Sequence, residues 1–515
     1  MHKYSLNLLA FLEGFIVMLL ELTVPHAMTP IIGNSLDSWA TLILLSVGGL
    51  ALGYFLGSRI CSLSNTSYYL FPLFVFSALS LTIGTLFLIY FSRISNTISE
   101  LTFLGILGLF SLFIPTVFLG ATTPILVAIQ GEKSSTGNLF STSTFGGVFS
   151  ALITGIFLLP QFGIITTLIV AVVLLSILLF LTPSHFSGIK KYAFVSPLLM
   201  LIGFNSLECE NQNNQLNVLH FSEGLNGQLL VLEQPSQTNP KEKDRLLLIN
   251  RMGQTWVNAS RFNSIWSYVN YMTSIASIKP KGSKTLILGL GGGVLANQVV
   301  NWCGHQVKAV DLDEKVIDLA KEFFNLSFEI ETFADDARHY LNQSTEQFDV
   351  ISMDIFSGEI APSHVLSKES FEEVKRCLKK DGIFVINFNG FLKGEKGKSS
   401  RALLKTLLSC GFHVQLFATT ERGGEEHHNT LFIAYFKEPA WETASITVAY
   451  QGKTHYVQEH FLDLKQLTLN DVPIITDDSP QMELFNRSAA QSWRENYLKN
   501  ITLKYRNEAG LPVIR

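Results

Sequence analysis

The stretch KTLILGLGGGVLANQVV, residues 284–300, decides the fold of the second half of this 515-residue chain. It begins as a short apolar run that is typical of a buried strand. It then turns on four glycines within five residues and continues with the apolar spacing of a helix. A strand that leads through a tight turn into a helix is the first part of a β–α–β unit. The stretch therefore predicts an α/β fold.

The same alternation of strand and helix continues toward the C-terminus. It recurs in residues 306–324, 328–343, 348–358 and 382–390. Strands that alternate with helices predict a parallel, doubly wound sheet, and we expect this domain at residues 266–440. Two strand-like stretches with Asn-Gly and Met-Gly turns precede it and predict a small β-rich subdomain at residues 216–265. Residues 441–515 are expected to form a C-terminal extension.

The composition separates the chain into two regions that face different solvents. The chain is 47% hydrophobic and only 16% charged, whereas about 25% charged residues are usual in soluble proteins. The apolar excess lies in residues 5–207, which predicts an integral membrane helical domain at residues 1–207. The net charge of −4 gives no indication of a nucleic-acid partner. The five cysteines are scattered without a CxxC pair, so neither a disulfide framework nor a metal site is predicted.

The number of membrane spans is six or seven. A spanning helix needs about 20 mostly apolar residues. A short seventh candidate, Tyr192–Leu207, contains Pro197 and leaves the count open. The six longer segments are Leu6–Val24, Trp39–Gly57, Tyr69–Phe91, Leu101–Ile129, Leu139–Leu159 and Ile164–Leu181.

Two acids, Glu13 and Glu21, fall inside the first predicted span on roughly one helix face. An acid at membrane depth is costly and can mark a polar pathway. The alternative is that Glu13 pairs inside the bundle while Glu21 lies at the interface. Glycine-rich stretches in the spans are expected to serve close helix packing.

The distribution of basic residues predicts the orientation of the membrane half. All but one of the loop cations lie on the side of the N-terminus, which places that terminus in the cytoplasm. Six spans would then leave the second half of the chain in the cytoplasm, and a seventh would export it. The loop cations are Lys3, Arg59, Lys133, Lys190 and Lys191 on one side and Arg93 on the other.

Candidate ligand-binding residues follow the strands of the predicted sheet, where such folds bind ligands. Gly289 and Gly291 form a turn without Cβ atoms, which lets a ligand approach the backbone. Asp311 ends the next strand about twenty residues on, where an acid can hold two ribose hydroxyls. Asp313 beside it is expected to cap the following helix.

The third predicted strand is followed by Asp335 and Asp336, at a usual place for an adenine contact. Helix capping by Asp335 is the alternative. Taken together, the glycine turn and these acids predict a nucleoside site. The glycines depart from the GxGxxG fingerprint of dinucleotide-binding folds and suit a nucleoside with a thioether or sulfonium group better than a pyrophosphate.

The sequence of the second half resembles a known family, the spermidine synthase-like polyamine aminopropyltransferases, which have a methyltransferase-type Rossmann sheet. The first half looks like the multi-span region that is fused to such domains in some bacteria, which implies a multi-pass protein of the bacterial inner membrane. The matching stretches are GQLLV (227–231), NRMGQT (250–255), LILGLGGG (286–293), VDLDEKVIDLAKEFF (310–324), DDARHYL (335–341), FDVISMDIFSG (348–358) and, in the first half, residues 21–60, 118–129 and 145–163.

The resemblance implies a cosubstrate, decarboxylated S-adenosylmethionine, and no metal. It also implies that Asp354 is the base that takes a proton from the attacking amine, a role that a carboxylate can fill. Gln254 and Tyr268 match positions that shape the amine pocket. The cosubstrate would be held by Gln228, Gly289, Gly291, Asp311, Asp336 and Ala337.

Departures from the family pattern put the acceptor in doubt. Gly292 stands where the soluble enzymes have an acid, Ser357 stands where they have a second acid, and Val269-Asn270 replaces a His-Glu pair. Each lost charge-assisted contact is worth about 1.5–3 kcal/mol, so doubly charged putrescine would be poorly matched. Substitutes for the lost groups, each equally open to a plain loop or turn role, are Glu359, His364, Asp477 and Asp478.

Three hypotheses follow for the whole chain. The first is a membrane-anchored aminopropyltransferase with an amine or polyamine substrate and the lipid bilayer as its partners. The second keeps the nucleoside site but uses S-adenosylmethionine and another acceptor. The third is a non-catalytic protein that binds or transports polyamines. Whether the chain forms a homodimer stays open.

Overall fold

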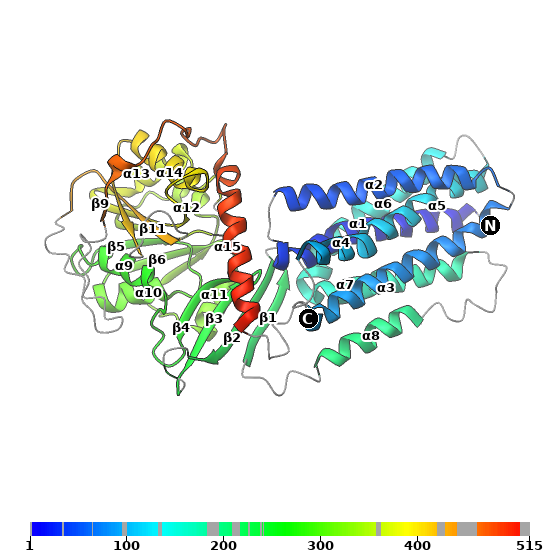
Figure 1. The fold of residues 1–515 in the computed structure, drawn as a ribbon, viewed down its shortest axis with the longest axis horizontal. Coiled ribbons are helices and arrows are strands. Elements are labelled where there is room, and N and C mark those ends of the chain that lie inside the picture. Colours follow the sequence, from blue (N-terminus) through cyan, green and yellow to red (C-terminus); the bar gives the residue numbers. More distant parts are fainter. Residues whose placement is uncertain are drawn as a thin grey trace. The chain divides into compact units, whose positions relative to one another are not determined.

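The chain folds into two compact units in the computed structural model (Figure 1). The first contains residues 1–215, 221–229 and 500–515, and the second contains residues 216–220 and 230–499. The structure describes residues 3–32, 36–63, 65–94, 100–131, 136–182, 195–208, 217–224, 227–236, 239, 241–356, 362–419, 428–439 and 461–504.

The first unit is helical, as predicted. Five segments are long and apolar enough to cross a membrane: Ser5–Pro30, Trp39–Ile60, Thr66–Leu88, Gly105–Gln130 and Thr136–Leu181. Its helices are α1 (Lys3–Ile32), α2 (Leu36–Ile60), α3 (Leu70–Ile94), α4 (Glu100–Gly108), α5 (Ile114–Gln130), α6 (Thr136–Ile153), α7 (Leu159–Leu181) and α8 (Val195–Glu208).

The last of these segments accommodates two of the predicted spans. It has 46 residues, more than twice the length that one crossing needs. Its helix breaks at Gly163, where φ is 76° and ψ is −178°, a conformation that glycine adopts readily. The break lies inside α7, so the residues before Gly163 and those after it form two separate helical pieces. α8, in the region of the seventh candidate, has only 14 residues.

Close helix packing in this unit depends on small residues, as the glycine-rich stretches predict. A Cβ atom at Gly146 of α6 would overlap the backbone oxygen of Phe11 on α1. A Cβ atom at Gly53 of α2 would overlap the backbone oxygen of Val117 on α5 in the same way. These glycines let the α1–α6 and α2–α5 pairs approach closely.

Both acids of α1 have hydroxyl partners. Glu13 is only 2% exposed and accepts a hydrogen bond from the Ser143 hydroxyl of α6 at 2.8 Å. Glu21 is partly buried and accepts a hydrogen bond from the Ser46 hydroxyl of α2. For Glu13, the structure therefore agrees with the alternative of pairing inside the bundle.

A four-stranded sheet forms in the predicted β-rich region. Its order is β1 (Asn217–Gly224), β2 (Gly227–Pro235), β3 (Lys243–Ile249) and β4 (Met252–Asn258). Asn250 and Arg251 connect β3 to β4, and both have positive φ angles, of 49° and 66°. Two such residues make the turn whose twist matches an antiparallel hairpin.

The second unit contains the predicted doubly wound sheet. Strand order is β12-β10-β11-β9-β8-β5-β6-β7, and the neighbours from β9 to β7 are parallel. The antiparallel additions β11, β10 and β12 were not part of the prediction. The strands are β5 (Lys284–Leu288), β6 (Gln306–Asp311), β7 (Glu331–Ala334), β8 (Phe348–Met353), β9 (Leu378–Gly390), β10 (His413–Ala418), β11 (His428–Tyr435) and β12 (Phe461–Leu462).

The chain reverses its direction across the sheet between β5 and β8. From β5 it adds β6 and β7 on one side, and then β8 and β9 on the other. In open α/β sheets, ligands bind at such a switch point, beyond the carboxyl ends of the strands. The glycine turn follows β5 and Asp354 follows β8, so the fold brings both predicted features to this point.

Helices cover both faces of this sheet (Figure 1). α13 and α14 contribute to a buried cluster with Leu288, Met353 and Phe384 on one face. α9 lies against β9 and β11. The helices of this unit are α9 (Ser267–Ala276), α10 (Val294–Gln298), α11 (Glu314–Phe323), α12 (Ala337–Gln343), α13 (Lys368–Cys377), α14 (Lys398–Ser409) and α15 (Met482–Lys504), which extends into the first unit.

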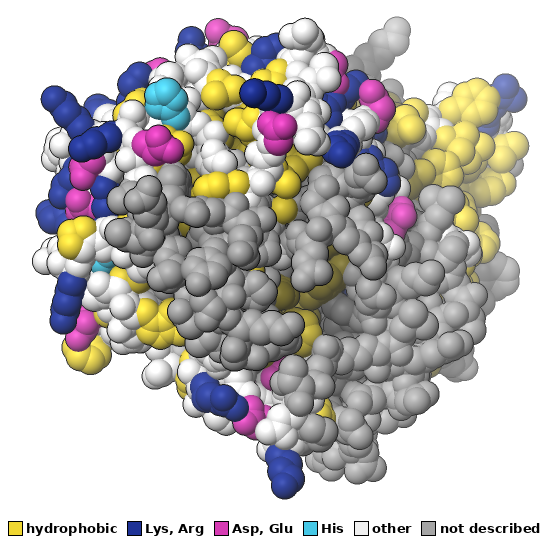
Figure 2. Space-filling model, turned by 60° about the vertical axis from the view of Figure 1, so that its left-hand side comes forward, with side chains coloured by type: hydrophobic (Ala, Val, Ile, Leu, Met, Phe, Trp, Pro, Cys, Tyr) yellow, Lys and Arg dark blue, Asp and Glu magenta, His cyan; other side chains and the backbone are white. Residues whose placement is uncertain are grey.

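The two units differ in the side chains that they expose. Figure 2 shows Lys and Arg side chains interspersed with Asp and Glu side chains over the second unit. On α2 and α6 of the first unit, the exposed side chains are large and apolar instead. They are Ile43, Leu44, Val47, Leu52, Phe55, Phe145, Val148, Phe149 and Leu152.

Candidate active site

Asp354 lies immediately after β8, where two other side chains hold its carboxylate. Its Oδ1 accepts a hydrogen bond from Nδ2 of Asn387 at 2.7 Å, and its Oδ2 accepts one from the Tyr268 hydroxyl at 3.1 Å. Burial raises the pKa of Asp354, and these two hydrogen bonds oppose that rise because they favour the ionised form. The carboxylate is thus fixed in position by two donors.

Asn387 is a site residue that sequence reasoning missed. It lies on β9 in register with the residue after β8, which places it beside Asp354. Asn387 is 4% exposed, and its Oδ1 has no hydrogen-bond partner among the described residues. A buried acceptor without a partner is costly, so the site has a free acceptor next to the carboxylate. The only signal in the sequence was its position near the end of a buried strand.

Tyr268 reaches Asp354 from the first turn of α9. It is 8% exposed, and its ring stacks on the ring of Trp266 at a centroid distance of 6.1 Å. Burial, followed by the charge of Asp354, raises the pKa of Tyr268 well above its ordinary value. The phenol therefore stays protonated and donates to the carboxylate. The predicted pocket residue is thus next to the predicted base.

The glycine turn after β5 touches the turn that carries Asp354. Gly289 has φ of +90°, and a Cβ atom there would overlap the backbone oxygen of Asp354. Gly291 has φ of +53°. The amide of Gly292 donates a hydrogen bond to the Thr255 hydroxyl of β4 at 2.8 Å. The β3–β4 hairpin therefore holds one side of the glycine turn.

Asp311, at the end of β6, binds the same turn. Its Oδ2 accepts hydrogen bonds from the amides of Leu290 at 2.9 Å and Gly291 at 3.2 Å. Burial raises the pKa of Asp311, while hydrogen bonds from the amides of Asp313, Leu290 and Gly291 oppose the rise. The side chain is only partly buried, so one edge of the carboxylate can receive ligand hydroxyls.

Asp313 caps α11, as predicted, because its side chain accepts a hydrogen bond from the Lys315 amide at 3.0 Å. The alternative that Asp335 caps the next helix is wrong. Asp336 caps α12 through the amides of Arg338 and His339, because it is the residue directly before the helix. Asp335 instead contacts the His339 ring at 2.9 Å.

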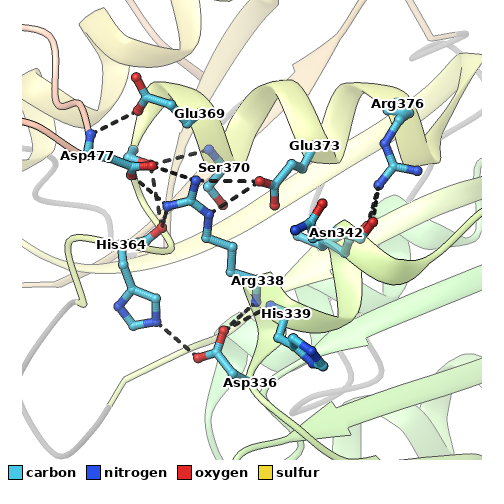
Figure 3. Close-up of polar contacts among 12 residues, drawn as sticks. Asp336, Arg338, His339, Asn342, His364, Glu369, Ser370, Glu373, Arg376 and Asp477 are labelled. Atoms are coloured by element: carbon cyan, nitrogen blue, oxygen red, sulfur yellow. Dashed lines mark hydrogen bonds and ion pairs between the residues drawn. The ribbon is translucent and has the colours of Figure 1, made fainter.

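The second oxygen of Asp336 contacts Nε2 of His364 at 3.0 Å (Figure 3). Burial alone would raise the pKa of Asp336, but hydrogen bonds from His364 and from the amides of His339 and Arg338 outweigh it and lower the pKa. Ala337 is buried as the first residue of α12. The predicted adenine contacts thus begin a capped helix.

A network around Arg338 fixes the start of α12 (Figure 3). Its guanidinium makes two hydrogen bonds of 2.6 Å to the carboxylate of Asp477 and two longer ones to Glu373 of α13. It also donates to the backbone oxygen of His364. Asp477 and His364 were candidates to replace the acids that the family pattern has. In the structure, Asp477 binds Arg338 of α12, and His364 binds Asp336.

The remaining predicted site residues are located only by their strand and their burial, or lie outside the described residues. Gln254 is partly buried on β4, next to Thr255, and Gln228 is buried on β2 in the first unit. Ser357 and Glu359 lie outside the described residues. In the part of the chain that the structure describes, no group of three or more His, Cys, Asp or Glu side chains could hold a metal ion.

Comparisons with known proteins point to one family. The family model of the spermine/spermidine synthase domain matches residues 267–420. Polyamine aminopropyltransferase 2 of Aquifex aeolicus is 23% identical over 79% of this chain and 83% of its own length. Polyamine aminopropyltransferase of Vibrio vulnificus is 29% identical over 23% of this chain and 42% of its own length. A Bifidobacterium longum protein named "Probable polyamine aminopropyl transferase" is 31% identical over 27% of this chain and 32% of its own length.

Two of these relatives match this chain over only part of their own length. The chain spans less than half the length of the Bifidobacterium and Vibrio proteins. The solved structure of spermidine synthase from Thermotoga maritima is similar over 55% of this chain and 88% of its own, with 13% identity and a TM-score of 0.35. The matched residues 267–420 contain Tyr268, Gly289, Asp311, Asp336 and Asp354.

Proposed function

We propose that the chain is an aminopropyltransferase, because the family model of the spermine/spermidine synthase domain matches residues 267–420. It would transfer the aminopropyl group of decarboxylated S-adenosylmethionine to an amine. The observation that carries this proposal is the pair of turns at the switch point. One turn presents Asp354 between Asn387 and Tyr268, and the other presents the glycines next to Asp311.

Asp354 is suited to the role of base. An ammonium ion is not a nucleophile, so the amine must lose a proton before or during attack. Its nitrogen then forms a bond to the carbon next to the sulfonium, the C–S bond breaks with its electrons going to sulfur, and methylthioadenosine leaves. Asp354 attracts the ammonium and takes its proton, and the free Oδ1 of Asn387 can accept a second N–H of the same amine.

The residues present fit the nucleoside part of the cosubstrate. Backbone without Cβ atoms at Gly289 and Gly291 leaves room beside the Asp311 carboxylate, which would accept both ribose hydroxyls. Asp336 and Ala337 would contact the adenine, and Gln228 the rest of the cosubstrate. Alignment of the amine and the sulfonium carbon would supply much of the remaining acceleration.

The acceptor is proposed to carry less charge than putrescine. At the place of the family's His-Glu pair, Val269 and Asn270 are buried, and Oδ1 of Asn270 accepts a hydrogen bond from Gln298 at 3.1 Å. This position therefore offers no carboxylate to a distant ammonium. Gln254 and Tyr268 would line the amine pocket.

Membrane anchoring is the second part of the proposal. The exposed large apolar residues of α2 and α6 would contact lipid, since such a surface is unfavourable in water. Five helical segments have the necessary length and hydropathy. The protein would then be a multi-pass protein of the bacterial inner membrane, with the lipid bilayer as its partner.

Two measurements test the proposed chemistry. Calorimetric titration of the detergent-purified protein should show binding of methylthioadenosine and of decarboxylated S-adenosylmethionine, and absence of both would end the proposal. Turnover should require the decarboxylated cosubstrate. Turnover with S-adenosylmethionine alone would favour methyl transfer to another acceptor instead.

Replacing Asn387 by alanine is expected to shift the acid limb of the pH–rate profile to higher pH. The Asn387 hydrogen bond favours the ionised form of Asp354, so its loss raises the pKa of that carboxyl further. Asp354 acts only when ionised, and activity therefore disappears at a higher pH as the solution is acidified. The profile of kcat/KM against pH measures this, and an unchanged or lower acid limb would contradict the assignment. Asn389→Ala, two residues further along the same strand, is the control.

A further inference from the structure

α15 contacts the β3–β4 hairpin, which in turn contacts the glycine turn of the candidate active site. We propose that Tyr497 of α15 is a positioning residue. It holds the β3–β4 hairpin against the glycine turn and against Trp266, whose ring stacks on the ring of Tyr268. This inference rests on the proposed function, because it concerns the same cosubstrate and base.

The contact between α15 and the hairpin is made at the turn itself. The Gly253 amide donates a hydrogen bond to the hydroxyl oxygen of Tyr497, and burial raises the pKa of that phenol. Nη2 of Arg494, one helical turn earlier, donates a hydrogen bond to the Asn250 carbonyl at 3.1 Å. Two side chains from one face of α15 therefore hold both sides of the turn.

Gly253 has no room for a side chain at this place. A Cβ atom would overlap the Tyr497 hydroxyl and would lie 3.1 Å from the indole ring of Trp266. The absence of a side chain thus lets Tyr497 and Trp266 approach the hairpin from two directions. A shift of the hairpin would move both neighbours.

From Gly253, two short paths lead to the site. Along the backbone, Thr255 is two residues further on and accepts the hydrogen bond from the Gly292 amide in the glycine turn. Through side chains, Trp266 stacks on Tyr268, whose hydroxyl donates to Asp354. The hairpin is therefore in direct contact with the turn that would receive the cosubstrate, and it reaches the donor that orients the base through Trp266.

The other end of α15 is anchored on the Rossmann domain. Met482 is buried in the same cluster as α13 and α14, and the Ser399 hydroxyl of α14 donates to Oδ1 of Asn486 at 3.1 Å. α15 is one continuous helix, so it holds the hairpin at a fixed distance from α14 (Figure 1). The position of the hairpin relative to α14 then depends on the hydrogen bonds that Arg494 and Tyr497 make to it.

Tyr497→Phe is the direct test, because it removes the hydroxyl and keeps the ring. The Gly253 amide then loses its partner, and the hairpin relaxes away from the glycine turn. We expect an increase of about tenfold in KM for the cosubstrate and a similar loss in the calorimetric affinity for methylthioadenosine. The decrease in kcat should be smaller, about two- to threefold, because Asp354 and its Asn387 bond remain. A purely structural role would lower the melting temperature without this split between KM and kcat.

The control is Gln491→Ala, which changes an exposed residue of the same helix whose side-chain amide donates a hydrogen bond to Glu495. It should behave as the unmodified protein. If Tyr497→Phe does not fold, Arg494→Gln tests the second hairpin bond with the same readouts. Unchanged affinity in a folded Tyr497→Phe protein would overturn the inference. Absence of methylthioadenosine binding by the unmodified protein would instead count against the proposed function.

Discussion

Replacing Asp354 by asparagine is expected to reduce turnover by about 10²–10⁴-fold, the usual contribution of a general base. The asparagine side chain has nearly the same shape and can keep contacts with Asn387 and Tyr268. It cannot take a proton or attract the ammonium ion. Cosubstrate binding should therefore stay within about threefold of the unmodified protein, because Asp311 and the glycine turn are unchanged.

The measurement is kcat with the decarboxylated cosubstrate, together with a calorimetric titration of methylthioadenosine. Asp349→Asn is a matched control, since Asp349 is on the same strand, at the opposite end from the site. Its carboxylate binds Lys379 at 2.9 Å and the Lys284 amide at 2.8 Å, so the change alters a charge on β8 away from the chemistry. Asp349→Asn should keep full turnover. If Asp354→Asn also kept it, Asp354 would not be the base.

The fold of the second unit could be predicted because its sequence pattern is local. Strands β5, β6 and β8 are short, mostly apolar runs that end on or are followed by glycine or an acid, so the parallel core follows from the alternation with helices. The antiparallel strands β10, β11 and β12 were missed. Their direction depends on which edge of the sheet they join, and no local pattern specifies that.

The site residues that were missed are those whose partners are remote in sequence. Asn387 meets Asp354 only because β9 pairs with β8 in one register, and a shift of one residue would turn its side chain to the other face. Arg338 meets Asp477 across 139 residues. The alternative of capping by Asp335 failed by one position, because Asp335 and Asp336 are adjacent and only the backbone decides which one precedes α12.

The helical first unit shows a different limit. The apolar pattern placed two expected spans, Leu139–Leu159 and Ile164–Leu181, on either side of the break at Gly163, but it did not identify which residue is the partner of Glu13. The Ser143 hydroxyl lies on α6, in a helix far along the chain, and helix pairing alone brings it to α1.

Replacing Asp311 by asparagine is expected to weaken cosubstrate binding by about 10–100-fold, since a hydrogen bond to a charged group contributes about 1.5–3 kcal/mol. The amide can still accept from Leu290 or Gly291, so the turn is kept. It no longer offers a charged acceptor to both ribose hydroxyls. kcat at saturating cosubstrate should fall little, because Asp354 follows a different strand, β8, and keeps its hydrogen bonds from Asn387 and Tyr268.

Asp313→Asn is the control for this prediction. Asp313 is two residues away and caps α11 through the Lys315 amide, a role that asparagine fills almost as well. It should therefore leave the affinity for methylthioadenosine unchanged. Calorimetry of both variants with decarboxylated S-adenosylmethionine, which is cationic, separates a specific effect of one carboxylate from a general loss of negative charge beside the glycine turn. Equal weakening in both would show that the charge of the region, and not the position of Asp311, attracts the cosubstrate, because the sulfonium and the amine are both cationic.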